Sequence, residues 1–132
     1  MTNIELGAFS RCTSLTNVYF LGNAPSAGSS IFTNDPATVY YMPGTTGWGT
    51  TFGDRPTVCW NPQAMNLGVQ SNSFGFIITG SSNLVIVVEA CTNLAEGAWI
   101  LLSTNTLTGG VSSFSDPNWT NYPSRFYRFR AP

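Results

Sequence analysis

The hydrophobic and polar positions at the start of the chain follow the spacing of one turn of a solenoid. The apolar side chains of residues 4–20 fall into a short helical turn, a corner and a strand, and they are Ile4, Ala8, Phe9, Cys12, Leu15, Val18 and Phe20. A turn of this kind cannot bury its apolar face alone, and about three or more stacked turns are normally needed. We therefore expect an apolar edge here that another surface covers.

The solenoid pattern weakens between residues 21 and 62. Residues 21–30 have the Gly, Ser and Pro content of a loop, and Ile31-Phe32 has the form of the start of a second turn. Strands are expected at 37–41 and 57–60, with turn-forming residues between them. This weakening is typical of a segment that caps a solenoid.

Two motifs in this half resemble a known family. Gly7-Ala8-Phe9 followed by Cys12-Thr13-Ser14-Leu15 is similar to the surface-antigen (BspA-like) class of bacterial leucine-rich repeats. The run Val39–Trp48 resembles the segment that often closes such arrays. The resemblance covers about residues 1–62. It implies a truncated leucine-rich-repeat unit with its cap, and a parent protein that is extracellular or on the cell surface.

The rest of the chain has the short period of an antiparallel β-module. The polar residues 63–73 are expected to form a linker. Residues 74–79 and 84–90 are rich in β-branched and aromatic side chains, and the Gly80–Asn83 turn between them predicts a hairpin. The strands expected at 99–103, 111–115 and 125–129 would complete a small β-sandwich-like module over residues 74–132.

This second half is similar to a small β-module at the C-terminal ends of secreted proteins of environmental bacteria. The residues that carry the similarity are Glu89–Leu94, Trp99, Phe114–Asp116 and Arg125–Arg128. The resemblance implies no defined activity. The fold class predicted for the whole chain is mainly β, in two parts.

Composition narrows the possible partners. The chain has 132 residues, of which 42% are hydrophobic and only 8% are charged, so Ser, Thr, Asn and Gly must supply its polar surface. That surface is typical of extracellular all-β modules. With no lysine and a net charge of −1, the chain lacks the basic field that nucleic acid requires. No signal peptide is recognised, and the longest apolar run, 84–88, is too short to span a membrane.

The three cysteines lie far apart in the sequence. Cys12, Cys59 and Cys91 form no Cys-x-x-Cys pair, and their odd number argues against a complete disulfide framework. Each is expected to be a buried thiol, and a bridge between Cys59 and Cys91 is the one disulfide left open. No cofactor and no metal ion is expected.

The residue types in the chain exclude most catalytic mechanisms. Without histidine or lysine, Ser-His-Asp and Cys-His catalysis and Schiff-base chemistry are excluded. Two carboxylates could still hydrolyse a glycoside, and Glu89 and Asp116 are then the catalytic candidates. The plainer interpretation pairs Glu89 with Arg125 or Arg128 and makes Asp116 a turn former before Pro117.

Loop aromatics allow a third function. Trp48, Trp119 and Tyr122 lie among Gly, Pro and Asn residues and could stack on sugar rings, although packing inside the fold is the competing interpretation. In the last strand, alternation places Phe126, Arg128 and Arg130 on one face and Arg125, Tyr127 and Phe129 on the other.

These patterns predict a non-catalytic accessory, adhesion or protein-interaction module of an extracellular protein. A small carboxylate-dependent hydrolase and a carbohydrate-binding module are the alternatives. The partner would be a protein or glycan surface. The apolar repeat edge also predicts a homo-oligomer, because unpaired strand edges bind one another.

Overall fold

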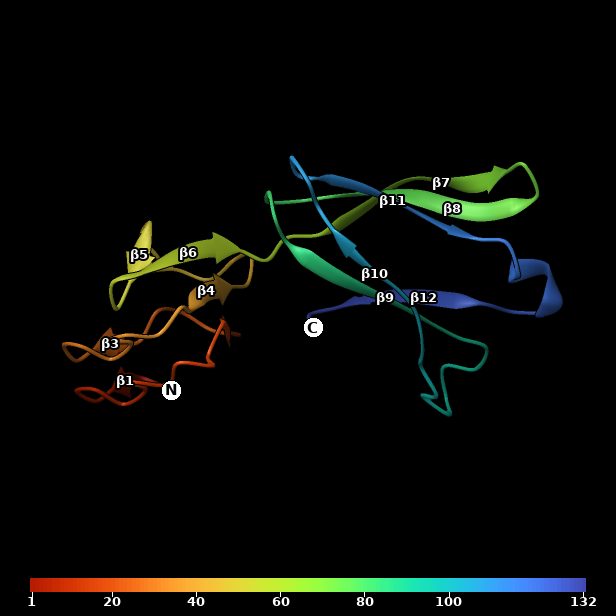
Figure 1. Ribbon diagram of the computed structural model, residues 1–132. Helices are drawn as coiled ribbons and strands as arrows, with labels where there is room; N and C mark the ends of the chain where they lie inside the picture. The colour runs from red at the N-terminus through yellow and green to blue at the C-terminus, as the bar shows by residue number, and fades with distance from the viewer. The chain divides into compact units, whose positions relative to one another are not determined.

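The computed structural model describes residues 1–132, which divide into two compact units, Met1–Asn61 and Pro62–Pro132 (Figure 1). Both units are built from strands, and the one helical element is a short 3-10 helix, η1 (Trp119–Asn121). The predicted mainly β fold class is confirmed. No helix in the structure has the length and apolar character needed to cross a bilayer.

The first unit is a coil whose successive turns add parallel strands to two sheets. One sheet has the strand order β1-β3 and the other the order β2-β4-β6-β5, in which only β5 runs antiparallel to its neighbour. The strands are β1 (Asn3–Ile4), β2 (Asn17–Phe20), β3 (Ser26–Ala27), β4 (Thr38–Tyr41), β5 (Thr51–Phe52) and β6 (Arg55–Cys59).

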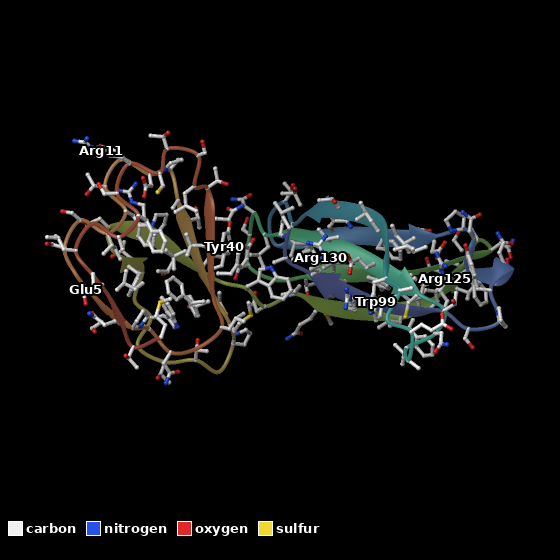
Figure 2. All side chains as sticks on the ribbon, turned by 90° about the horizontal axis from the view of Figure 1, so that it is seen from below. Glu5, Arg11, Tyr40, Trp99, Arg125 and Arg130 are labelled. Atoms are coloured by element: carbon white, nitrogen blue, oxygen red, sulfur yellow. The ribbon has the colours of Figure 1, made fainter.

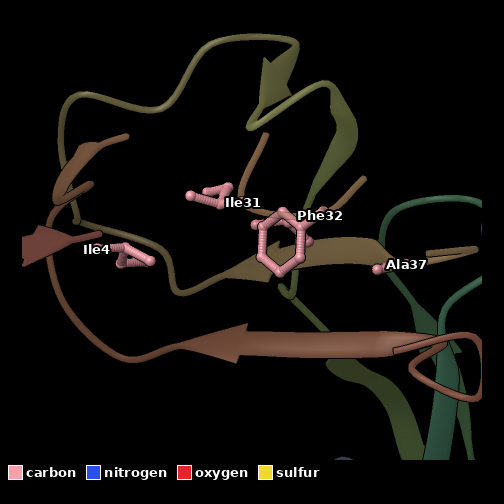
Figure 3. Packing of buried hydrophobic residues seen from close by; sticks show 5 residues of the cluster. Ile4, Ile31, Phe32 and Ala37 are labelled. Carbon is pink, nitrogen blue, oxygen red and sulfur yellow. The ribbon is translucent and has the colours of Figure 1, made fainter. Parts of the chain in front are cut away.

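Like residues stack on like residues from one turn to the next. Val18 pairs with Val39 in the parallel register, and the rings of Tyr19 and Tyr40 stack with centroids 4.8 Å apart. Between the two sheets lies a core of Ile4, Ile31, Phe32, Ala37 and Val39 (Figure 3). Since neighbouring turns contribute the same side-chain types, each turn completes the burial of the one before it.

The second unit is a sandwich of two three-stranded antiparallel sheets, which form the two layers seen in Figure 1. Their strand orders are β11-β8-β7 and β10-β9-β12. The strands are β7 (Gln63–Gln70), β8 (Ser73–Thr79), β9 (Val85–Cys91), β10 (Ile100–Thr106), β11 (Val111–Asp116) and β12 (Phe126–Arg130). Phe76 of β8 contacts Tyr127 and Phe129 of β12 edge-on, so aromatic rings fill the space between the layers.

The segment 63–73, predicted as a linker, is β7 and the turn that leads into β8. The apolar residues Met65, Leu67 and Val69 alternate with polar or small ones, which is the period of a strand. The alternation is easily taken for a polar linker because β7 is an edge strand and nearly all of it is exposed.

The predicted hairpin of 74–79 and 84–90 is also wrong, because β8 and β9 belong to different sheets. Each is the central strand of its sheet and already has two neighbours. The backbone of the turn between β8 and β9 is hydrogen-bonded to the segment 107–110: Gly80 N–H donates to Gly110 O and Asn83 N–H donates to Leu107 O. The Gly80–Asn83 turn therefore carries the chain from one layer to the other.

The cysteines differ in environment. Cys12 is exposed, contrary to the prediction of a buried thiol, because Leu15 rather than Cys12 packs against the core of the first unit. Cys91 is a buried free thiol in β9, so the bridge to Cys59 is not formed. Burial raises the pKa of the Cys59 thiol.

Candidate functional site

Strand β12 organises the charges of the second unit. Its residues alternate between the two faces of the sheet, so Arg128 and Arg130 project from the outer face while Tyr127 and Phe129 pack against β8. The register places Arg128 opposite Glu89 of β9. The alternation predicted for the last strand is therefore confirmed.

Glu89 is held by two arginines on the outer face. Arg128 Nε donates to Glu89 Oε2 at 2.8 Å, and Arg130 Nε donates to Oε1 at 2.9 Å. Hydrogen bonds from Arg130 and Arg128 hold the pKa of Glu89 below its ordinary value. The Arg128 guanidinium also lies over the Trp99 ring, 4.2 Å from its centroid, and Figure 2 labels Trp99 and Arg130 on this unit.

Asp116, at the end of β11, forms a separate and more deeply buried cluster. Arg125 Nε donates to Asp116 Oδ2 at 2.6 Å, and only 6% and 5% of these two side chains are exposed. The Tyr127 hydroxyl donates to the same oxygen at 3.1 Å, and the Asn118 N–H donates to Oδ1 at 3.0 Å. The pKa of Tyr127 is raised to about 12 by burial, by the hydrogen bond from its hydroxyl to Asp116 and by the Asp116 charge.

The structure gives Glu89 and Asp116 different partners on different faces of β12. Glu89 binds the outward Arg128 and Arg130, whereas Asp116 binds Arg125 and the inward Tyr127. The expected pairing of Glu89 with Arg128 is present, and Arg125 binds Asp116 instead. Asp116 also forms the expected turn, because it accepts the Asn118 N–H. Each carboxylate thus serves as the counter-charge of an arginine.

The three aromatic candidates, Trp48 in the first unit and Trp119 and Tyr122 in the second, have different surroundings. Trp48 stacks on Tyr41 with ring centroids 5.3 Å apart and also contacts Phe20 and Phe52, so it packs against the core of the first unit. Trp119 in η1 is half-buried beside Phe74. Tyr122 is exposed, and the Arg125 guanidinium lies 4.1 Å from its ring centroid.

The apolar edge expected from the first motif is present in the first unit. Strand β2 is the end strand of its sheet, with β4 on one side and no strand on the other. Beside it lies a hollow of about 490 Å³ whose apolar lining includes Ile4, Phe9, Val18, Phe20 and Leu21. Of these, Ile4 belongs to the buried core and Leu21 is among the most exposed apolar side chains of the chain.

A second hollow, in the second unit, was not predicted from the sequence. It has a volume of about 450 Å³ and lies between the edge strands β7 and β12. Ala64 and Leu67 are the residues of β7 that line it. The alternation of Met65, Leu67 and Val69 does not predict this surface, because the register against β8 shifts between Met65 and Gly68 and the three side chains do not share one face.

No group of three or more His, Cys, Asp or Glu side chains gathers where it could hold a metal ion. Comparison of the chain with protein-family models, with curated proteins and with solved structures finds no match. The functional inference therefore rests on the geometry of the surfaces.

Proposed function

We propose that this protein is a non-catalytic interaction module of an extracellular protein, and that it associates with a second copy of itself through the β2 edge. The observation that carries the proposal is the unpaired edge of β2 beside the apolar hollow. An exposed strand edge is a template for pairing with another strand, and an apolar hollow gains free energy when it is covered.

Two features favour a second copy as the occupant. Inside the unit, β2 stacks on β4 through like residues, with Val18 against Val39 and Tyr19 against Tyr40. A second copy of β2 offers side chains of the same apolar and aromatic kinds to this edge, in the antiparallel direction that a two-fold axis imposes. There is also no charged residue from Cys12 to Asn34, so two copies can approach without repulsion.

The test is the oligomeric state of the chain and of a charged variant. Leu21 is 79% exposed and lines the hollow, so Leu21→Lys places a charge in the proposed interface without disturbing the core. Burial of one leucine contributes about 1.5–3 kcal/mol, so we expect Leu21→Lys to raise the dissociation constant at least about tenfold. Light scattering over a range of protein concentrations measures this constant.

Leu6→Lys is the matched control, since Leu6 is 69% exposed in the same unit but does not line the hollow. This variant should associate as the unchanged chain does. A protein that stays monomeric at high concentration, or an equal loss of association in both variants, would reject self-association through β2.

A further inference from the structure

The sheet β11-β8-β7 carries a hollow on the face that points to solvent. Phe74 and Phe76 of β8 pack inside the sandwich, so the Gly75 position between them faces outward. The register places Gly75 between Gly68 of β7 and Ser115 of β11. Because two of these three positions have no side chain, the middle of the face is open, and a hollow of about 300 Å³ lies over it.

The side chains around this hollow are polar, uncharged and open to solvent. Asn66 and Gln70 of β7 supply amides, and Ser73, Ser113 and Ser115 supply hydroxyls. Four of the five are exposed and Ser73 is half-buried. No charged residue lines the hollow. Since these donors and acceptors lie at the surface, a ligand in the hollow can reach them.

One of the two glycines is not required by the fold. Gly75 is required, because a Cβ there would lie 2.6 Å from Phe114 O. At Gly68 a Cβ would meet nothing within 4 Å, and the left-handed φ of the nearby bulge falls on Asn66 instead. Glycine weakens a strand, and within one it often marks a place where a ligand approaches the backbone closely. Gly68 therefore fits a ligand that lies on the floor of this hollow.

The lining argues against three classes of ligand. A charged ligand finds no counter-charge there, and an apolar ligand would remove polar side chains from water without replacing their hydrogen bonds. An added peptide strand requires a free strand edge. The floor of the hollow is β8, whose backbone pairs with β7 on one side and with β11 on the other, so it offers no free edge.

An uncharged sugar ring meets the requirements that remain. Its hydroxyls donate and accept hydrogen bonds, as amide and hydroxyl side chains do, and its C–H face can lie on the glycine backbone beside Ile77. The volume of the hollow is at the lower end of the range of ligand sites. We propose that this hollow binds an uncharged hexose polymer. The site goes beyond the proposed self-association, which uses the first unit alone, and none of the three loop aromatics lines it.

The test uses the full chain and four uncharged hexasaccharides, cellohexaose, laminarihexaose, mannohexaose and maltohexaose, with isothermal titration calorimetry as the binding measurement. They differ in sugar and linkage, so together they sample the proposed class of ligand. Hexagalacturonic acid is the charged counterpart, because each of its rings carries a carboxylate. We expect at least one uncharged hexasaccharide to bind with a dissociation constant below about 1 mM, and the charged one to bind at least about tenfold more weakly than that hexasaccharide.

Two variants of the protein locate the site. Gly68→Thr fills the floor of the hollow, and it should fold normally because threonine suits a strand and its Cβ meets nothing within 4 Å. Ala64→Thr is the matched control. It adds bulk to the same strand, but Ala64 lines the hollow between β7 and β12 and not this one. We expect affinity for the sugar to fall at least about tenfold in Gly68→Thr and to stay unchanged in Ala64→Thr.

Amide chemical shifts in NMR spectra supply a second readout. The shifts of Gly68, Gly75 and Ser115 should change when the sugar binds, and those of β10, which belongs to the other sheet, should not. Shift changes centred on Trp48, Trp119 or Tyr122 instead would overturn the proposal, since they would place the sugar at the loop aromatics.

Three results of the calorimetry would also overturn it. They are absence of binding by all four uncharged hexasaccharides, equal or tighter binding of hexagalacturonic acid, and an affinity that is unchanged in Gly68→Thr or falls equally in both variants. Failure of the Leu21→Lys test leaves this proposal standing, because that variant probes the first unit.

Discussion

At the scale of single residues, a chain with few charges places most of its arginines against carboxylates. Of the five arginines, three lie on or beside β12, and all three form ion pairs. The two kinds of pair differ in burial. The Arg125–Asp116 pair is almost completely buried, while Arg128 and Arg130 are close to half exposed, and an exposed pair contributes little to stability.

Removing the charge of Asp116 should destabilise the protein strongly. Asp116→Asn leaves the buried Arg125 guanidinium without a counter-charge, and breaking a buried pair in this way costs about 3 kcal/mol or more. Urea unfolding at neutral pH measures the loss. Glu96→Gln, an exposed loop position of the same unit, is the control and should change stability by less than about 0.5 kcal/mol. A loss below about 1 kcal/mol in Asp116→Asn would mean that Arg125 gains another partner.

Glu89 should contribute to loss of stability in acid. Hydrogen bonds from Arg130 and Arg128 lower its pKa from the ordinary value of 4.5, so the folded state holds the Glu89 proton less tightly than the unfolded state. Its contribution is fully present above pH 4.5 and is lost as the pH falls through the lowered pKa. Urea unfolding at neutral pH should show Glu89→Gln to be less stable than the unchanged chain. As the pH is lowered through the acid range, the free energy of unfolding should fall less steeply in this variant than in the unchanged chain. An equally steep decline would count against this role.

The sequence allowed the faces of the last strand to be predicted, but not the pairing of its arginines. Alternation alone puts Tyr127 and Phe129 opposite Arg128 and Arg130. Which carboxylate faces Arg128 and Arg130 depends on the register of β12 against β9, which no local pattern contains.

At the scale of elements, the positions of strands were more predictable than their partners. The β-branched runs at 74–79 and 84–90 are strands, as their composition predicts. Their assignment to different sheets depends on β7 and β10, which lie far from that turn in the sequence. β7 itself went unrecognised because its side chains cover little of the core.

The close approach of β8 to β11 gives a test at this scale. A Cβ on Gly75 would lie 2.6 Å from Phe114 O, so Gly75→Ala must push two paired strands apart, at a cost of about 1–3 kcal/mol. Gly68, directly opposite Gly75 on β7, is the matched control, since a Cβ there meets nothing within 4 Å. Thermal unfolding should show Gly68→Ala unchanged or slightly more stable. Equal losses in both variants would contradict the role of strand spacing.

At the scale of the whole molecule, composition and periodicity were enough to predict a mainly β chain whose pattern changes near residue 62. They were enough because a low charge content and short strand-like runs leave few other architectures open. The hollow between β7 and β12 could not be predicted in this way. The hollow lies between the first and the last strand of the second unit, which are the edge strands of two different sheets. These two strands come together only in the folded chain.

The position of β5 limits how far the proposed association through β2 would extend. In the sheet order β2-β4-β6-β5, the side of β6 away from β4 is occupied by β5, a two-residue strand that runs in the opposite direction. A sheet in which only one end can pair with another strand cannot polymerise head to tail, because the other end cannot pair with the next molecule. If the chain associates through β2 as proposed, that contact would therefore close about a two-fold axis and join two copies, so the first unit alone would give a pair rather than a fibre.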